Sequence, residues 1–166
     1  MNSLLYLGLE GVLFANRRRP PLSHGDAERA AKQSVLVLPI INAVQTIFDV
    51  SIVLNSWWVA DYGYRSIFQL LPDELACKTI GATMPGNRTH RRPIELQARA
   101  DILRSDIARR NPHRVAIVDA FSSAIPFEYL SRSLNVSASF SGNIDSFSSK
   151  FFRLLVSDQP TSTTDI

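Results

Sequence analysis

Short apolar runs alternate along this chain with longer stretches that have a helical pattern of apolar positions. We expect five of the apolar runs to be strands, because each has the length of a strand buried on both faces. They are residues 3–9, 50–54, 78–82, 114–118 and 151–156. Strands that alternate with helices are typical of parallel sheets. The pattern therefore predicts a three-layer, doubly wound α/β fold with about five strands.

The helical stretches lie between these runs. They are residues 27–48, residues 62–71 and residues 93–110. Pro39 should break or kink the first of these, so that its second half is a separate helix with Pro39 in the first turn. We expect the serine-rich segment 131–149 to be a loop. A length of 166 residues suits a single domain. We place that domain at residues 1–158 and expect the polar residues 159–166 to be a flexible tail.

The chain is mildly basic, and the positions of its basic residues are more informative than its net charge. The chain has 18 Lys and Arg residues and 15 Asp and Glu residues, which gives a net charge of +3. Local clusters of basic residues occur at 17–19, 88–92 and 104–114. Arg17, Arg18 and Arg19 follow the first predicted strand, and we expect them to bind a phosphate-bearing macromolecule or a nucleic acid end. A solvated loop without a ligand remains the alternative.

Cysteine content and hydropathy give expectations about location. The single cysteine, Cys77, excludes an internal disulfide and suits a reducing compartment. No apolar run reaches the roughly 18 residues that a membrane span requires. We therefore expect a cytoplasmic protein that makes no membrane contact.

Polar residues follow several of the predicted strands. Glu10 lies just beyond the first, Asn55 and Ser56 follow the second, and Asp119 follows the fourth. In a parallel sheet these positions meet at one edge, where open α/β sheets bind their ligands. Carboxylates, a small hydroxyl or amide group and a nearby arginine can hold a phosphate and a hard metal ion. Polar residues also occur at strand ends for no functional reason, and that interpretation stays open.

The same segments resemble a known family. Residues 6–13, YLGLEGVL, resemble the first motif of the haloacid dehalogenase-like (HAD) superfamily, in which two hydrophobic residues precede Asp-x-Asp-Gly-Val-Leu. The segments IVLNSW, LLPDEL and IGAT, at 52–57, 70–75 and 80–83, resemble the HAD domain of bacterial RNA-repair ("Swiss army knife") proteins. Residues 115–119, VAIVD, resemble the family's fourth motif.

The resemblance implies phosphatase chemistry, from which this chain departs. In the family, the first aspartate of motif one attacks the phosphoryl group, and the matching position here is Gly8. The second aspartate is the general acid and base, and Glu10 matches it. The fourth motif supplies carboxylates to Mg²⁺, and of these only Asp119 remains. Glu10 and Asp119 are thus weak candidates for a magnesium site.

For each of two further family roles, the resemblance gives two candidate positions in this chain. The motif-two group that binds the phosphoryl oxygens falls on Asn55 or, with a shift of one residue, on Ser56. The basic residue of motif three falls on Arg91 or Arg92. Short spacings at the usual insertion points imply a capless fold with an open crevice, which in this family favours macromolecular substrates.

Loss of a covalent nucleophile commonly costs several orders of magnitude in rate. The sequence therefore favours a catalytically impaired pseudophosphatase that binds a phosphate-bearing or protein partner. One alternative is an active Mg²⁺-dependent phosphatase that acts on a macromolecular or nucleic-acid-end phosphate through Glu10, Ser56, an arginine and Asp119. The other is a structural or interaction module without a ligand.

Overall fold

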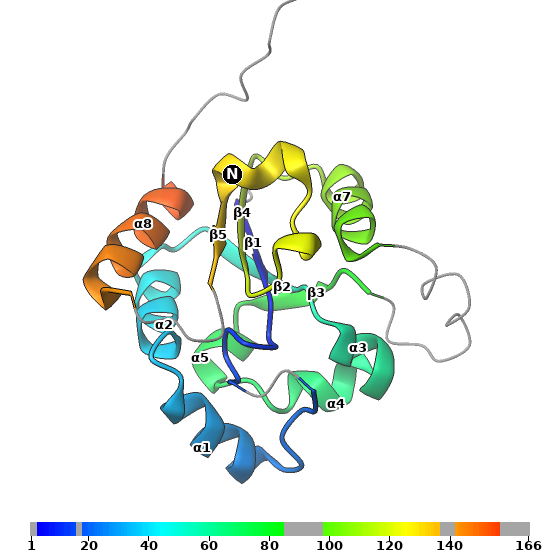
Figure 1. Ribbon diagram of the computed structural model, residues 1–166, viewed down its shortest axis with the longest axis vertical. Helices are drawn as coiled ribbons and strands as arrows, with labels where there is room; N and C mark the ends of the chain where they lie inside the picture. The colour runs from blue at the N-terminus through cyan, green and yellow to red at the C-terminus, as the bar shows by residue number, and fades with distance from the viewer. Residues whose placement is uncertain (1–2, 16–17, 85–97, 137–141, 157–166) are drawn as a thin grey trace, which may run out of the picture.

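A five-stranded, all-parallel sheet forms the centre of the protein (Figure 1). The computed structural model describes residues 3–15, 18–84, 98–136 and 142–156. The strands lie in the order β3-β2-β1-β4-β5. Their bounds are Ser3–Leu7 for β1, Val50–Leu54 for β2, Thr79–Ala82 for β3, Arg114–Asp119 for β4 and Ser133–Asn135 for β5. This sheet confirms the predicted parallel α/β fold.

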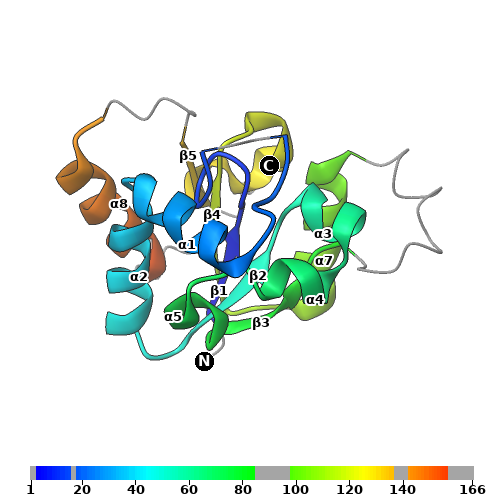
Figure 2. The same cartoon turned by 90° about the horizontal axis from the view of Figure 1, so that it is seen from below.

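Helices cover both faces of the sheet. Helices α1, α2 and α8 lie on one side of the sheet and α7 lies on the other (Figures 1 and 2), while α4 contributes Ile67 to the hydrophobic cluster shared with α1, α2 and α8. The helix bounds are His24–Gln33 (α1), Val37–Thr46 (α2), Trp57–Tyr62 (α3), Tyr64–Phe68 (α4), Asp73–Ala76 (α5), Arg99–Arg110 (α7) and Ile144–Val156 (α8). Two 3₁₀ helices, η2 (Ser122–Ala124) and η3 (Phe127–Arg132), follow β4. Within the described ranges, no helix is long and apolar enough to cross a membrane.

The central strand β1 is buried on both faces, as its continuous apolar run predicts. Leu5 and Leu7 pack into the larger hydrophobic cluster, which includes residues of α1, α2 and α8. Leu4 and Tyr6 face the opposite way and pack against α7. The alternation follows from the two-residue period of a strand and fixes which face each side chain covers.

The prediction of a fifth strand at residues 151–156 is wrong. These residues form the second half of helix α8, and the fifth strand is Ser133–Asn135, inside the segment predicted to be a loop. Phe147, Phe151 and Leu155 are buried at a spacing of four residues, which is the period of a helix face. The apolar run 151–156 is ambiguous by itself, and the helical period emerges only when Phe147 is included.

Several predicted helix boundaries also differ from those in the structure. The stretch 27–48 contains two helices, separated at residues 34–36, and Pro39 lies in the first turn of α2, as the sequence predicts. Ser34 closes this break by donating a hydrogen bond from its Oγ to the carbonyl oxygen of Val12, at 2.7 Å. The predicted helix 62–71 is shorter in the structure: α4 covers Tyr64–Phe68, directly after α3 ends at Tyr62, and α5 begins beyond the predicted range, at Asp73. The first residues of the predicted helix 93–110 and the predicted tail lie outside the described residues.

The strand order creates one special edge. After β1 the chain builds β2 and β3 on one side, then returns to build β4 and β5 on the other. The carboxyl ends of β1 and β4 therefore form a topological switch point, where open α/β sheets usually bind ligands. Gly8 and Asp119 lie there, side by side: the Gly8 N–H donates to the Val118 carbonyl oxygen at 2.8 Å.

The helical assignment of residues 151–156 predicts unequal effects of two adjacent phenylalanines. Phe151→Ala removes a fully buried ring and should lower the free energy of unfolding by about 3–5 kcal/mol. Phe152→Ala, on the same helix but 43% exposed, should cost less than about 1 kcal/mol. Urea unfolding of both variants measures the difference, and equal losses would contradict the assignment.

Candidate functional site

A tight turn after β1 brings Glu10 back over the strand ends. The Gly11 N–H donates to the Phe14 carbonyl oxygen at 2.7 Å, and the Phe14 N–H donates to the Leu9 carbonyl oxygen at 3.1 Å. Gly11 has φ of 80°, a left-handed conformation that favours glycine. The turn therefore depends on the Glu-Gly sequence, and it buries the Glu10 side chain instead of exposing it.

Gly8 is needed for a different reason, which is close approach. A Cβ atom at this position would lie 2.8 Å from Asp119 Oδ2 and 2.9 Å from Asp119 Cγ. Any side chain here would require Asp119 to move. The Asp119 carboxylate thus fills the space from which a motif-one nucleophile would have to project.

Asp119 is held by three partners. Its Oδ1 accepts from the Phe121 N–H at 2.9 Å, while its Oδ2 accepts from Asn55 Nδ2 at 3.2 Å. The third partner is the Arg99 guanidinium, whose Nη2 lies 2.6 Å from Oδ2. These contacts fix the carboxylate on both oxygens and join β4, the end of β2 and helix α7.

Arg99 is the residue of this site that the sequence analysis missed. Its Nη2 also donates to the backbone carbonyl oxygen of Asn55 and lies 3.8 Å from Glu10 Oε2. Its guanidinium carbon lies 5.6 Å from the centre of the Phe121 ring, within range of a cation–π contact. The predicted cations, Arg91 and Arg92, lie outside the described residues.

A pattern in α7 is the signal that could have found Arg99. The buried positions of this helix occur at three- and four-residue spacings and include two charged residues. They are Arg99, Ile102, Leu103, Asp106 and Ile107. An arginine on the apolar stripe of a helix is rarely buried without an acidic partner. Asp106, on the same stripe, is paired instead with Arg109 and with Arg110, whose Nε lies 2.7 Å from its Oδ2.

The two predicted phosphate ligands after β2 are both occupied within the protein. The Asn55 amide donates to Asp119 through Nδ2, and its Oδ1 accepts from Thr83 Oγ1 at 3.1 Å. Ser56 is the N-cap of α3, and its Oγ accepts from the Trp58 N–H at 3.2 Å. The structure thus brings Asn55 into the cluster and assigns the Ser56 hydroxyl to helix capping.

The charged members of this cluster are almost inaccessible to solvent. The exposed fractions are 3% for Glu10, 6% for Arg99 and 0% for Asp119. Burial raises the pKa of Asp119 to about 6; Arg99 opposes this rise and the Glu10 charge adds to it. Glu10 Oε2 and Arg99 Nε have no hydrogen-bond partner among the described residues. We call Glu10, Asn55, Arg99 and Asp119 the strand-end cluster.

The strand-end cluster does not fit Mg²⁺ as it is arranged. Both candidate ligands, Glu10 and Asp119, face Arg99, and the Asp119 oxygen that a metal would take already has a guanidinium nitrogen at 2.6 Å. Within the described ranges, no group of three or more His, Cys, Asp or Glu residues could hold a metal ion. The resident cation of the cluster is an arginine.

The predicted basic loop is only partly described. Arg18 and Arg19 are exposed, and Arg17 lies outside the described residues. Arg19 lines a shallow pocket of about 370 Å³ together with Tyr62 and Ser66. The loop therefore presents positive charge to solvent and is not part of the buried cluster.

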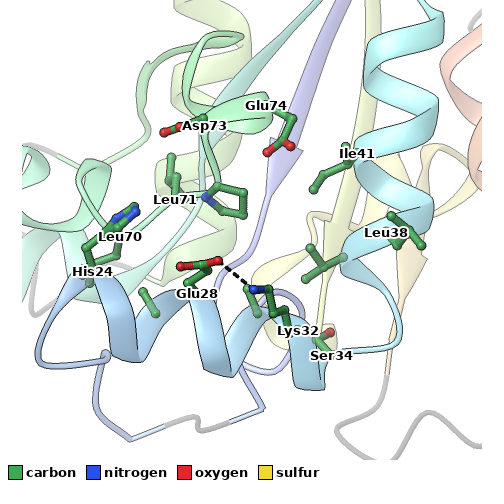
Figure 3. Close-up of a pocket in the computed structure, with 14 residues that line it drawn as sticks. His24, Glu28, Lys32, Ser34, Leu38, Ile41, Leu70, Leu71, Asp73 and Glu74 are labelled. Atoms are coloured by element: carbon green, nitrogen blue, oxygen red, sulfur yellow. Dashed lines mark hydrogen bonds and ion pairs between the residues drawn. The ribbon is translucent and has the colours of Figure 1, made fainter.

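A separate groove of about 450 Å³ lies between α1, α2 and residues 70–74 (Figure 3). Leu70, Leu71 and Ile41 are among its apolar lining residues. At its edge Lys32 pairs with Glu28 at 2.7 Å. No member of the strand-end cluster lines this groove, so the groove is separate from the predicted site.

Comparison with known proteins found no matching family model, no matching curated protein and no matching solved structure. The resemblance to the HAD superfamily therefore rests on the motifs alone.

The close approach at Gly8 predicts an asymmetry between two glycines. Gly8→Ala should lower the free energy of unfolding by about 1–3 kcal/mol, because the new methyl group overlaps Asp119. Gly25→Ala is the matched control: no atom lies within 4 Å of the added Cβ, and alanine favours helix α1. Denaturant unfolding compares the two, and a harmless Gly8→Ala would contradict the geometry.

Asp119 predicts an unusual dependence of stability on pH. Its pKa is about 6 in the folded protein and 3.8 ordinarily, so between these values the folded state binds the proton more tightly. The free energy of unfolding should therefore rise by about 1 kcal/mol as the pH falls from 7.5 to 5. Urea unfolding at both pH values measures this rise. Asp119→Asn, which cannot titrate, should lose it, whereas a wild-type protein that weakens over this range would contradict the prediction.

Proposed function

We infer that this protein is a catalytically inactive HAD-like protein, a pseudophosphatase that acts by binding a phosphate-bearing or protein partner. The observation that carries the proposal is the contact between Gly8 and Asp119. The position of the family's nucleophile has no side chain, and the neighbouring carboxylate lies 2.8 Å from where a Cβ would be. Covalent catalysis at this position would need both a new residue and a rearranged cluster.

The state of Glu10 supports the same proposal. A general acid or base must reach a proton on the substrate or on water. Glu10 is buried and faces Arg99, so proton exchange with a substrate outside would require the cluster to open. Burial of every charged member is typical of a structural ion-pair network and not of an open phosphatase crevice.

The exposed cations Arg18 and Arg19 favour phosphate groups as the partner's chemistry. They follow the turn that carries Glu10, and they are accessible where the cluster is not. Exposed arginines bind phosphate oxygens through paired hydrogen bonds. The affinity of such contacts falls as the salt concentration rises. A single-stranded nucleic acid end is the partner that this loop would suit.

One observation favours the alternative, an active Mg²⁺-dependent phosphatase. Glu10 Oε2 has no hydrogen-bond partner among the described residues, so it has the capacity to accept a proton from an attacking water. This mechanism would need Glu10 and makes a clear kinetic prediction.

Turnover of an aryl phosphate separates the two proposals. With Mg²⁺ present, we expect the wild-type protein and Glu10→Gln to give the same rate as buffer alone. The pseudophosphatase proposal fails if the wild-type protein shows Mg²⁺-dependent turnover that Glu10→Gln abolishes.

The binding arm of the experiment uses a 3′-phosphorylated single-stranded RNA and fluorescence anisotropy. We expect salt-sensitive binding that weakens about tenfold when Arg18 and Arg19 are both changed to Ser. Arg153→Ser, an exposed arginine on α8, is the control and should bind as the wild type does. Binding that ignores salt and both sets of variants would direct the search to a protein partner.

A further inference from the structure

We propose that the guanidinium of Arg99 is a built-in replacement for a divalent cation at the strand ends. In the native chain, Glu10 and Asp119 are neutralised from within and bind no Mg²⁺. Removal of Arg99 would turn the same oxygens into a divalent-cation site.

The contacts of a single nitrogen carry this proposal. Arg99 Nη2 faces three oxygen atoms, one from the Asp119 carboxylate, one from the Glu10 carboxylate and one from the Asn55 backbone. Carboxylate and carbonyl oxygens are also the ligands that Mg²⁺ and Ca²⁺ take from proteins. The guanidinium nitrogen therefore lies within 3.8 Å of three oxygens of the kind that a hard cation takes.

Charge and burial explain why the arginine is retained. Two carboxylates buried together repel each other and lose their hydration, so one of them must be paired or protonated. Arg99 is itself 6% exposed, and arginine side chains in proteins are always charged. An arginine thus supplies a permanent counter-charge that does not depend on the concentration of metal in the medium.

Competition from a free ion is unfavourable for two reasons. Mg²⁺ gives up its water reluctantly, and it would gain only two carboxylates here. It would also have to displace a guanidinium that packs against the Phe121 ring and is anchored at the first residue of α7. The displaced Arg99 guanidinium would then lose its contacts with Glu10 and Asp119.

The unpartnered oxygen of Glu10 is an independent observation that points to the same latent site. Glu10 Oε2 is buried, has no hydrogen-bond donor among the described residues and lies 3.8 Å from Arg99. The Arg99 guanidinium lies 2.6 Å from Asp119 and donates a hydrogen bond to it, whereas Glu10 interacts with Arg99 only through its charge. A small divalent ion with flexible coordination, such as Ca²⁺, could contact both once the arginine is removed.

This inference stands apart from the proposed function. A cluster that did bind Mg²⁺ would still lack turnover if Gly8 removes the nucleophile, so thermal stability is measured here and not activity. The unfolding midpoint is recorded in EDTA, in 10 mM MgCl₂ and in 10 mM CaCl₂, with NaCl added to equal ionic strength.

The variant is Arg99→Met, which keeps much of the volume and removes the charge. We expect the wild-type midpoint to move by less than about 1 °C between the three solutions. Arg99→Met should fall by about 10 °C in EDTA, because two buried carboxylates lose their partner, and should regain about 5 °C in CaCl₂. Arg104→Met, on the exposed side of the same helix, is the control and should respond to neither ion.

Two outcomes would overturn the proposal. One is a wild-type protein that gains as much from Mg²⁺ or Ca²⁺ as Arg99→Met does, and the other is a folded Arg99→Met that gains from neither. If Arg99→Met does not fold, the proposal is tested by the unfolding midpoint of the double variant Arg99→Met/Asp119→Asn. It should be more stable than the single variant and indifferent to Ca²⁺, and a double variant no more stable than Arg99→Met counts against the proposal.

Discussion

A buried guanidinium between two carboxylates joins the parts of this protein that the chain keeps far apart. Arg99 begins α7, Asp119 ends β4 and Glu10 lies in the turn after β1. Buried ion pairs add little net stability compared with apolar contacts of the same size, because each charge loses its hydration. Their loss on one side only is costly, however, since the remaining charge stays buried. We therefore expect the cluster to specify this arrangement more than it stabilises it.

The rest of the strand-end geometry depends on the same contact. Asp119 reaches Arg99 across the end of β1, and Gly8 leaves room for it because a Cβ there would overlap the carboxylate. Asn55 contributes both its amide and its backbone carbonyl to the two partners. The absence of a side chain at Gly8 and the position of the Asp119 carboxylate are thus one steric solution. A side chain at position 8 and the ion pair between Asp119 and Arg99 could not both be accommodated without a rearrangement.

The central strands could be predicted from the sequence because each is a continuous run of mostly apolar residues. β1, β2 and β4 are continuous apolar runs, and the strand-end rule placed Gly8, Glu10, Asn55 and Asp119 at one edge. β5 could not be predicted in the same way. It is a three-residue strand, Ser-Leu-Asn, defined by backbone pairing with β4 and not by its side chains. Arg99 was missed because the spacing of apolar positions in α7 can mark it as buried but cannot name its partners, which depend on how α7 packs against the sheet.

The charged stripe of α7 also limits how this region of the chain can change in length. Arg99 and Asp106 lie seven residues apart, about two turns, so both face the sheet at once. One inserted or deleted residue between them would rotate one relative to the other by about 100° and carry a charge away from its buried surroundings. Substitutions on the exposed side of α7 carry no such penalty. The helix should therefore vary freely in composition on its outer face while its residue count from 99 to 106 stays fixed.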